Sequence, residues 1–215
     1  MAKNDPKFRR EPTERKEALI LATLSLIAEQ GVRGATVREI AKRAQVTQGL
    51  IRHYFSSKEE LILASYEYHM SQMTALTSVL SDQANFSCMD RLRNFVMHSL
   101  SPPVVDPRSV SLWAGFLNKT YSDPRMHVIH KKTYCEFRDR LETLISCALA
   151  EADIPIDSQQ LRGLSIACNA VIDGLWMEGG ALEEAFETGE LSTIGLRSVS
   201  AIIGLDLMGS KGDHE

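Results

Sequence analysis

The sequence predicts an all-α fold, on the evidence of three features. Apolar residues recur at helical spacing along most of the chain. Residues that cap helices recur along it, several followed by proline or by a residue suited to a capping box. No run alternates apolar and polar residues between hairpin signals, as a β-strand would. With 215 residues, the chain is long enough to bury a substantial core.

Residues 36–60, TVREIAKRAQVTQGLIRHYFSSKEE, predict two short helices joined by a tight turn. Thr36 and Glu39 form a capping box that begins the first helix, and Thr47 caps the second. Ser57 and Glu60 form another capping box, at the start of a long helix that we expect to reach about Asp82. Two short helices in this arrangement are typical of a helix-turn-helix, whose second helix enters the major groove of DNA.

The second short helix divides into an apolar and a polar side. Leu50, Ile51 and Phe55 are expected to face inward. Gln48, Arg52 and His53 are expected closest to base edges, with Gly49 letting the helix approach. Lys58 opposes the dipole of its own helix, which a docked phosphate would explain. The expected DNA contacts are Thr36, Arg38, Thr47, Gln48, Gly49, Arg52, His53, Tyr54 and Lys58.

The run from Thr36 to Leu61, with the preceding helix ALILATLSLIAEQG, resembles the DNA-binding domain of the TetR family of bacterial transcriptional repressors. The resemblance covers roughly residues 13–62. The matching residues are Thr36, Ile40, Ala41, Ala44, Val46, Gly49, Tyr54, Phe55, Lys58 and Leu61. The family usually has glycine in the turn where this chain has Gln45. If that site needs a positive φ, glutamine there costs about 1 kcal/mol.

Charge is distributed unevenly along the chain. The whole chain has a formal net charge of −4, but residues 1–60 hold 12 Lys and Arg against 8 Asp and Glu. A basic N-terminal domain on an acidic body keeps phosphate attraction at one end. The segment KNDPKFRREPTERK adds cations before the first helix, either as a solvated tail or as an arm that reaches the minor groove.

The rest of the chain predicts helices only. Expected caps are Ser87 with Asp90, Asp106 before Pro107, Asp123 before Pro124, and Asp157 with Gln160, and the last helix is expected over 191–208. We therefore expect two domains. Residues 1–60 form the N-terminal arm and a three-helix helix-turn-helix DNA-binding domain. A long helix joins it to a helical ligand-binding and dimerisation domain, residues 61–215.

The segment 158–182 is apolar nearly all round, with Asp173 as the only charged residue from Gly163 to Met177. Such a helix must be covered on several sides. Together with the last helix it predicts a four-helix bundle between two copies of the chain, although the two helices could instead complete a monomeric core. A homodimer supplies the second reading head that a palindromic operator in double-stranded DNA needs.

The string DGLWMEGGAL at 173–182 and the residues around Trp113 and Phe116 resemble the choline-responsive branch of TetR-type repressors. This resemblance implies a small-molecule effector of the quaternary-amine type, which aromatic faces and a carboxylate would bind. The alternative is that these aromatic side chains are core. The candidate ligand residues are Trp113, Phe116, Tyr121, Phe137, Asp173 and Trp176.

The sequence offers no catalytic constellation, and we expect neither enzymatic activity nor a cofactor. His127 and His130 form the sole candidate metal pair, and we expect no metal site. No transmembrane or signal segment is present, which predicts a cytoplasmic protein without a membrane partner. The four cysteines are expected to be buried small hydrophobes in a reducing compartment, with a thiol sensor as the alternative. We predict a ligand-responsive repressor; the alternatives are a constitutive DNA-binding protein without a switch and an enzyme within the helical body.

Overall fold

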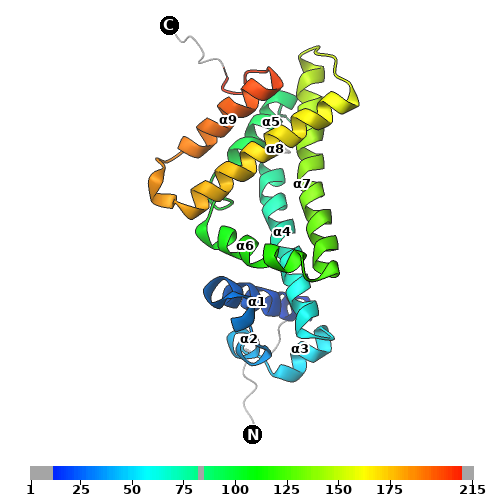
Figure 1. Ribbon diagram of the computed structural model, residues 1–215, viewed down its shortest axis with the longest axis vertical. Coiled ribbons are helices and arrows are strands. Elements are labelled where there is room, and N and C mark those ends of the chain that lie inside the picture. The colour runs from blue at the N-terminus through cyan, green and yellow to red at the C-terminus, as the bar shows by residue number, and fades with distance from the viewer. Residues whose placement is uncertain (1–11, 82–84, 210–215) are drawn as a thin grey trace. The chain divides into compact units, whose positions relative to one another are not determined.

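The computed structural model describes residues 12–81 and 85–209. Within these ranges the protein is helical and has no β-strand, which confirms the all-α prediction (Figure 1). The expected N-terminal arm begins outside the described residues. The predicted end of the long helix, at Asp82, also lies outside them. The helices are α1 (Pro12–Gly34), α2 (Val37–Ala44), α3 (Gln48–Tyr54), α4 (Lys58–Ser81), α5 (Cys88–Ser99), α6 (Pro107–Thr120), α7 (Pro124–Glu151), α8 (Ser158–Ala181), the 3₁₀ helix η2 (Glu183–Ala185) and α9 (Glu190–Ile203).

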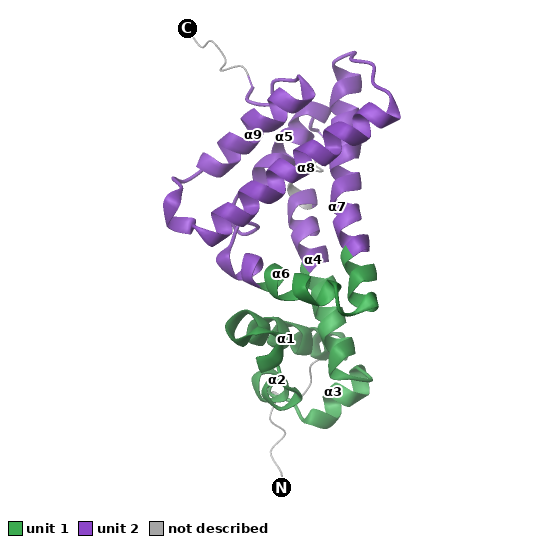
Figure 2. Cartoon of the chain, in the orientation of Figure 1, with its two compact units in different colours: residues 1–69, 112–130 green, residues 70–111, 131–215 purple. Residues whose placement is uncertain are grey.

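The chain divides into two compact units (Figure 2). Unit 1 holds residues 1–69 and 112–130, and unit 2 holds residues 70–111 and 131–215. Helices α4, α6 and α7 therefore contribute residues to both units. The division into a DNA-binding domain of residues 1–60 and a second domain of residues 61–215 stays a prediction.

Unit 1 is built around one apolar core. Helix α1 packs against α2, and α2 against α3. Each of the four N-terminal helices buries aliphatic side chains there because its apolar residues share one face. The fully buried members include Leu19 and Leu26 of α1, Ile40 of α2, Ile51 of α3 and Leu61 of α4. This core fixes the direction in which the short helix α3 presents its other face.

Unit 2 has a second core, shared by α5, α7, α8 and α9. Helix α8 packs against α9, and α9 also packs against α5. The buried side chains include Leu92, Phe95 and Val96 of α5, Leu141, Leu144 and Ile145 of α7, Cys168 and Ile172 of α8, and Leu196 and Val199 of α9. The expected interior position of helix 158–182 is thus confirmed for one of its faces.

Local capping chemistry determines most helix starts. The Ser87 and Asp157 side chains accept hydrogen bonds from the backbone amides of Asp90 and Gln160, as predicted. Asp106 Oδ2 accepts a hydrogen bond from the Ser109 amide at 3.0 Å, ahead of Pro107. Each of these bonds satisfies an amide that has no partner within its helix.

The last helix ends earlier than predicted. Helix α9 stops at Ile203, five residues before the expected end at Met208. Gly204 has a φ of 73° and donates its amide hydrogen to Ser200 O. That left-handed conformation is easy for glycine and terminates the helix. The apolar residues after Gly204 keep the helical spacing in the sequence, but they are not part of the helix.

Candidate nucleic-acid interface and effector site

The turn between α2 and α3 depends on Gln45. This residue has φ 57° and ψ 42°, the left-handed conformation that caps the end of α2. Its amide donates to Lys42 O at 3.2 Å, and the amide of Val46 donates to Ala41 O at 2.9 Å. The turn therefore has the backbone conformation that glycine adopts most easily, although a glutamine occupies it.

Helix α3 has two different sides. Ile51 is buried, with only 2% of its surface exposed, and Phe55 directly after the helix is also buried. The opposite side consists of exposed residues, namely Gln48, Gly49, Arg52 and His53. A β-carbon at Gly49 would meet, among the described residues beyond its own helix backbone, only Thr47 Oγ1 at 3.9 Å. The fold of the chain therefore does not itself require glycine at this position.

Four further residues among the expected DNA contacts differ in their environments. Thr36 Oγ1 accepts a hydrogen bond from the Glu39 amide at 3.2 Å, which confirms its capping role. Thr47 is exposed and stands at the start of α3 without a side-chain capping bond. Arg38 is exposed, and Tyr54 is half-buried with its ring 5.1 Å from that of His53.

Lys58 has a contact within the chain that the sequence did not indicate. Its ammonium lies 3.5 Å from the carbonyl oxygen of Val32, in the last turn of α1. The C-terminal end of a helix carries partial negative charge, so the cation is favourable there. This contact offers a second reason for the lysine at the start of α4, beside the proposed phosphate.

The start of α4 differs slightly from the predicted capping box. Ser57 Oγ accepts a hydrogen bond from the Glu60 amide at 3.1 Å, as expected. The Glu60 carboxylate, however, bonds the amide and hydroxyl of Ser56 rather than the amide of Ser57. Those two bonds lower the pKa of Glu60. The Glu60 side chain therefore accepts its backbone hydrogen bond from Ser56, one residue before the position that a capping box requires.

Arg43 is paired within unit 1. Its guanidinium forms an ion pair with the carboxylate of Glu29 on α1, with both terminal nitrogens engaged, and also donates to Ser25 Oγ at 2.7 Å. A side chain held in this way joins α2 to α1. It is therefore a poor candidate for a phosphate contact, although the sequence pattern placed it on the same polar side as Arg38 and Lys42.

The six candidate effector residues are divided between the units. In unit 1, Phe116 is fully buried and lies 4.7 Å from the Tyr66 ring, between ring centroids. Tyr66 is bonded to His130 Nδ1 at 2.6 Å, and its burial raises its pKa. Trp113 is half-buried, whereas Tyr121 is 90% exposed. The structure does not bring Tyr121 together with the other aromatic candidates.

Unit 2 holds Phe137, Asp173 and Trp176. The Asp173 carboxylate accepts hydrogen bonds from the Tyr134 hydroxyl and, at 2.8 Å, from the Asn169 amide group. Burial raises the pKa of Asp173, and the two hydrogen bonds offset part of that rise. No cation of the described chain is paired with this carboxylate. Arg162, on the same helix, is exposed and is not among the groups that act on this carboxylate.

The two aromatic candidates of unit 2 have partners of their own within that unit. The Phe137 ring lies 5.0 Å from that of Phe95, and the Trp176 indole donates to Val104 O at 2.8 Å. Asn169 is 3% exposed, and its carbonyl oxygen has no donor among the described residues. Sequence reasoning missed Tyr134 and Asn169. The signal for Asn169 was its position four residues before Asp173, on the same face of α8.

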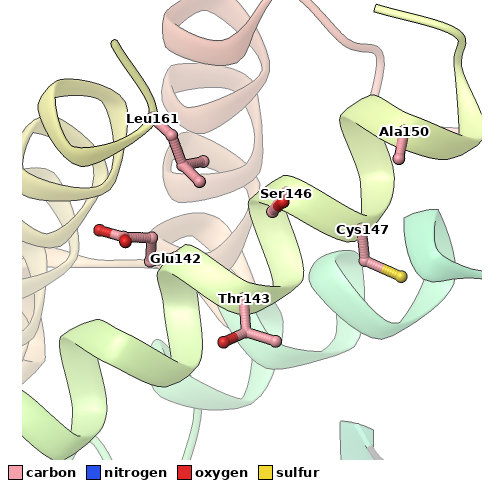
Figure 3. Close-up of a pocket in the computed structure, with 6 residues that line it drawn as sticks. All are labelled: Glu142, Thr143, Ser146, Cys147, Ala150 and Leu161. Carbon is pink, nitrogen blue, oxygen red and sulfur yellow. The ribbon is translucent and has the colours of Figure 1, made fainter. Parts of the chain in front are cut away.

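A separate open depression of about 400 Å³ lies along α7 and the start of α8 (Figure 3). It is lined by Glu142, Thr143, Ser146, Cys147, Ala150 and Leu161, and none of the predicted ligand residues is among them. Cys147 forms a disulfide with Cys88 of α5. The expectation that all four cysteines are unpaired is therefore wrong for Cys88 and Cys147, which are 59 residues apart in the sequence. Cys135 and Cys168 are free.

None of the helices within residues 12–81 and 85–209 is long and apolar enough to cross a membrane. These residues contain no group of three or more His, Cys, Asp or Glu side chains that could hold a metal ion.

Two family profiles match the chain. Residues 19–65 match "Bacterial regulatory proteins, tetR family", and residues 89–204, more than half of the chain, match "BetI-type transcriptional repressor, C-terminal". The chain belongs to the TetR family, with a C-terminal domain of the BetI type. The two matched segments contain the α2–α3 surface and the carboxylate of Asp173, respectively.

Full-length relatives of this BetI-type protein are regulators as well. The transcriptional regulator BetI of Pectobacterium carotovorum is 28% identical over 190 residues, covering 88% of this chain and 93% of that protein. The BetI regulator of Burkholderia mallei is 26% identical over 174 residues, covering 81% of this chain and 86% of that protein.

Solved structures show the same fold. A transcriptional regulator from Pseudomonas aeruginosa aligns with a TM-score of 0.81 at 29% identity, over 91% of this chain and 93% of that one. A regulator from Saccharomonospora viridis, solved in complex with choline, aligns with a TM-score of 0.68 at 18% identity, over 89% of this chain and 96% of that one. The BetI-type chain is thus a DNA-binding transcriptional regulator and not an enzyme, as predicted.

Proposed function

We propose that this regulator binds a palindromic operator as a cytoplasmic homodimer and releases it when a small cationic effector, of the quaternary-amine type, binds unit 2. Helix α3 is the reader. Arg52, His53 and Gln48 face the bases, since all three are exposed on the side opposite Ile51. The open space at Gly49 supports close approach of the helix to DNA.

A second copy of the chain covers the outer faces of α8 and α9. Ile166 and Met177 of α8 and Ile194 of α9 are each more than a third exposed, beside the exposed small residues Ala170 and Ala201. An apolar face of this kind on two packed helices suits a partner with the same surface. Two reading heads related by a two-fold axis then match two half-sites of a palindrome.

The partly buried carboxylate of Asp173 is the observation that carries the switch. A carboxylate withdrawn from water is costly to charge, and Tyr134 and Asn169 compensate for only part of that cost. A bound cation supplies the missing charge. The faces of Phe137 and Trp176 add a cation–π contribution of roughly 0.5–2 kcal/mol if the cation lies over either ring. The choline complex of the S. viridis relative supports this class of effector.

Release follows from a shift between two arrangements of the dimer. Helix α4 runs from unit 1 into unit 2, so a change within unit 2 can alter the spacing of the reading heads. An effector that binds better to the wrongly spaced arrangement weakens operator binding by no more than the difference between its two affinities.

The binding half of the proposal is tested by selecting operators from random duplexes with the full-length protein. We expect two inverted half-sites about one helical turn apart, bound by two copies of the chain. An asymmetric single half-site bound by a monomer would contradict the proposal.

The effector half is tested by calorimetry with choline and the DNA-free protein. We expect saturable binding that falls at least about tenfold in Asp173→Asn, because the variant keeps the shape but loses the charge. The matched control is Asp139→Asn, an exposed carboxylate on α7, which should bind choline as the parent does. Equal binding by parent and Asp173→Asn would remove this carboxylate from the effector site.

A further inference from the structure

The Cys88–Cys147 disulfide involves none of the residues assigned above to the reading helix or to the site at Asp173. It joins the first residue of α5 to the penultimate turn of α7, with a Cα–Cα distance of 5.4 Å. Both cysteines are half-buried. In reducing compartments, disulfides are uncommon and are usually transient or redox-sensing. A bridge of this kind in a transcriptional regulator therefore needs a chemical explanation.

The start of α5 has a second, weaker tie to α7. The Met89 amide donates to Glu151 Oε2 at 3.0 Å. The two ties hold the same end of α5 against the same end of α7. Because the disulfide alone is covalent, opening it leaves this end of α5 dependent on one exposed hydrogen bond and on the core contacts further along the helix.

The two cysteines differ in their relation to the depression along α7. Cys147 lines the open depression of about 400 Å³ along α7, whereas Cys88 does not (Figure 3). The depression has room for a small molecule beside the disulfide. Thiol–disulfide exchange depends on which sulfur the incoming thiolate can reach. Access from solvent therefore favours attack at the Cys147 side.

We propose that the Cys88–Cys147 bond is a thiol-exchange site whose substrate is a small thiol that enters this depression. The thiolate of the small molecule attacks Cys147 Sγ and forms a mixed disulfide, while the bond to Cys88 breaks and Cys88 leaves as a thiolate. A second small thiol then attacks the mixed disulfide. It releases Cys147 as a thiolate and the two small molecules as their own disulfide, so the protein pair gains the two electrons that the thiols lose.

The depression also selects among thiols by charge. Glu142 lines it, and its carboxylate accepts a hydrogen bond from Ser165 Oγ at 2.9 Å. A negative charge close to the point of attack disfavours an anionic thiol and favours a cationic one. Across solvent of high dielectric constant the effect of one charge is on the order of two- to threefold in rate.

The first test maps the attacked sulfur. The air-oxidised full-length protein is exposed briefly to cysteamine, quenched with acid, alkylated and digested, and the peptides are identified by mass spectrometry. We expect the cysteamine adduct on Cys147 and the alkyl group on Cys88. An adduct mainly on Cys88, or four alkylated cysteines before any thiol is added, would overturn the proposal. Cys135→Ser is the matched control, and its exchange should equal that of the parent because Cys135 is free.

The second test concerns charge selection and uses Glu142→Gln, which keeps the acceptor for Ser165. The rate of cysteamine relative to that of 3-mercaptopropionate should fall two- to threefold in this variant. An unchanged ratio would remove Glu142 and its depression from the route of attack.

The third test measures what the bond does for unit 2. A bridge that closes a 59-residue separation should raise the melting temperature on the order of 5–15 °C. Reduction of the parent should lower the melting temperature by this amount, and Cys88→Ser and Cys147→Ser should melt like the reduced parent with or without reductant. If the oxidised and reduced parent proteins have the same melting temperature, thiol exchange at this bond does not change the stability of unit 2.

Discussion

Tyr134 of α7 donates its hydroxyl hydrogen to the carboxylate of Asp173 on α8. Burial raises the pKa of the Tyr134 hydroxyl to about 12, and burial also raises the pKa of Asp173. Neither group ionises as readily as it would in water. The pair gives unit 2 a partly buried acid whose charged form a bound cation would stabilise.

The first prediction concerns stability and pH. Because the pKa of Asp173 is higher in the folded than in the unfolded state, the folded protein binds more protons across that interval. The contribution of Asp173 to the free energy of unfolding therefore falls as pH rises from the ordinary aspartate range through the raised value. Asp173→Asn should lose that fall. Urea titrations between about pH 4 and 8 measure it as the difference between variant and parent.

The matched control for this prediction is again Asp139→Asn, whose carboxylate is exposed. It measures what replacing a carboxylate by an amide does to stability at an exposed position of α7. If Asp173→Asn runs parallel to the parent, the carboxylate does not titrate differently on folding.

The second prediction concerns the turn of the reader. Gln45→Gly should stabilise unit 1 by about 1 kcal/mol, because Gln45 has a φ of 57°. Gln45→Ala should give no such gain, since alanine has the same β-carbon. Chemical denaturation followed by a probe in unit 1 measures both. A less stable glycine variant would mean that the glutamine side chain contributes more than its backbone strain costs.

The third prediction separates base contacts from phosphate contacts. Arg52→Ala should weaken operator binding by about 1–3 kcal/mol and relax specificity at one position. Lys58→Ala should weaken binding to all sequences and reduce the salt slope by about one. Fluorescence anisotropy at several salt concentrations distinguishes the two.

Arg43→Ala is the control for this experiment, because its guanidinium is already paired with Glu29. It should leave the salt slope unchanged, although some stability is lost. If the salt dependence of operator binding falls for Arg43→Ala and not for Lys58→Ala, then Arg43 and not Lys58 contacts a phosphate.

The fourth prediction concerns assembly. Ala170 is exposed on α8 within one chain, and in the proposed dimer Ala170→Glu places an unpaired charge in an apolar interface. The variant should be monomeric, and its operator affinity should collapse. Light scattering at matched concentrations measures the mass, and circular dichroism establishes that the variant is folded. Ala152→Glu, an exposed residue just after α7, should remain a dimer. A folded Ala170→Glu dimer would place the interface elsewhere.

Local signals made much of the fold predictable. The capping bonds at Thr36, Ser87 and Asp157 each join residues three apart, so that the sequence alone contains both partners. The end of α9 was less predictable, because the apolar residues after Gly204 preserve the helical pattern. There the backbone conformation of one glycine outweighed the side-chain periodicity.

The candidate sites were predictable only in part. The exposed side of α3 follows from helical spacing around Ile51. The partners of Asp173 and Cys88 could not be found in the same way, since Tyr134 and Cys147 come from another helix and lie 39 and 59 residues away. Neither partner is marked by any local spacing. Only the packing of unit 2 brings these side chains together.

The coupling between effector and operator tests the central claim most directly. Choline affinity should be measured by calorimetry for the free regulator and for the regulator saturated with its selected operator. Linkage requires that operator binding weaken choline binding by the same factor by which choline weakens operator binding, typically 5- to 150-fold. We expect this reciprocal loss in the parent and its absence in Asp173→Asn. Equal choline affinity with and without operator would contradict a ligand-released repressor.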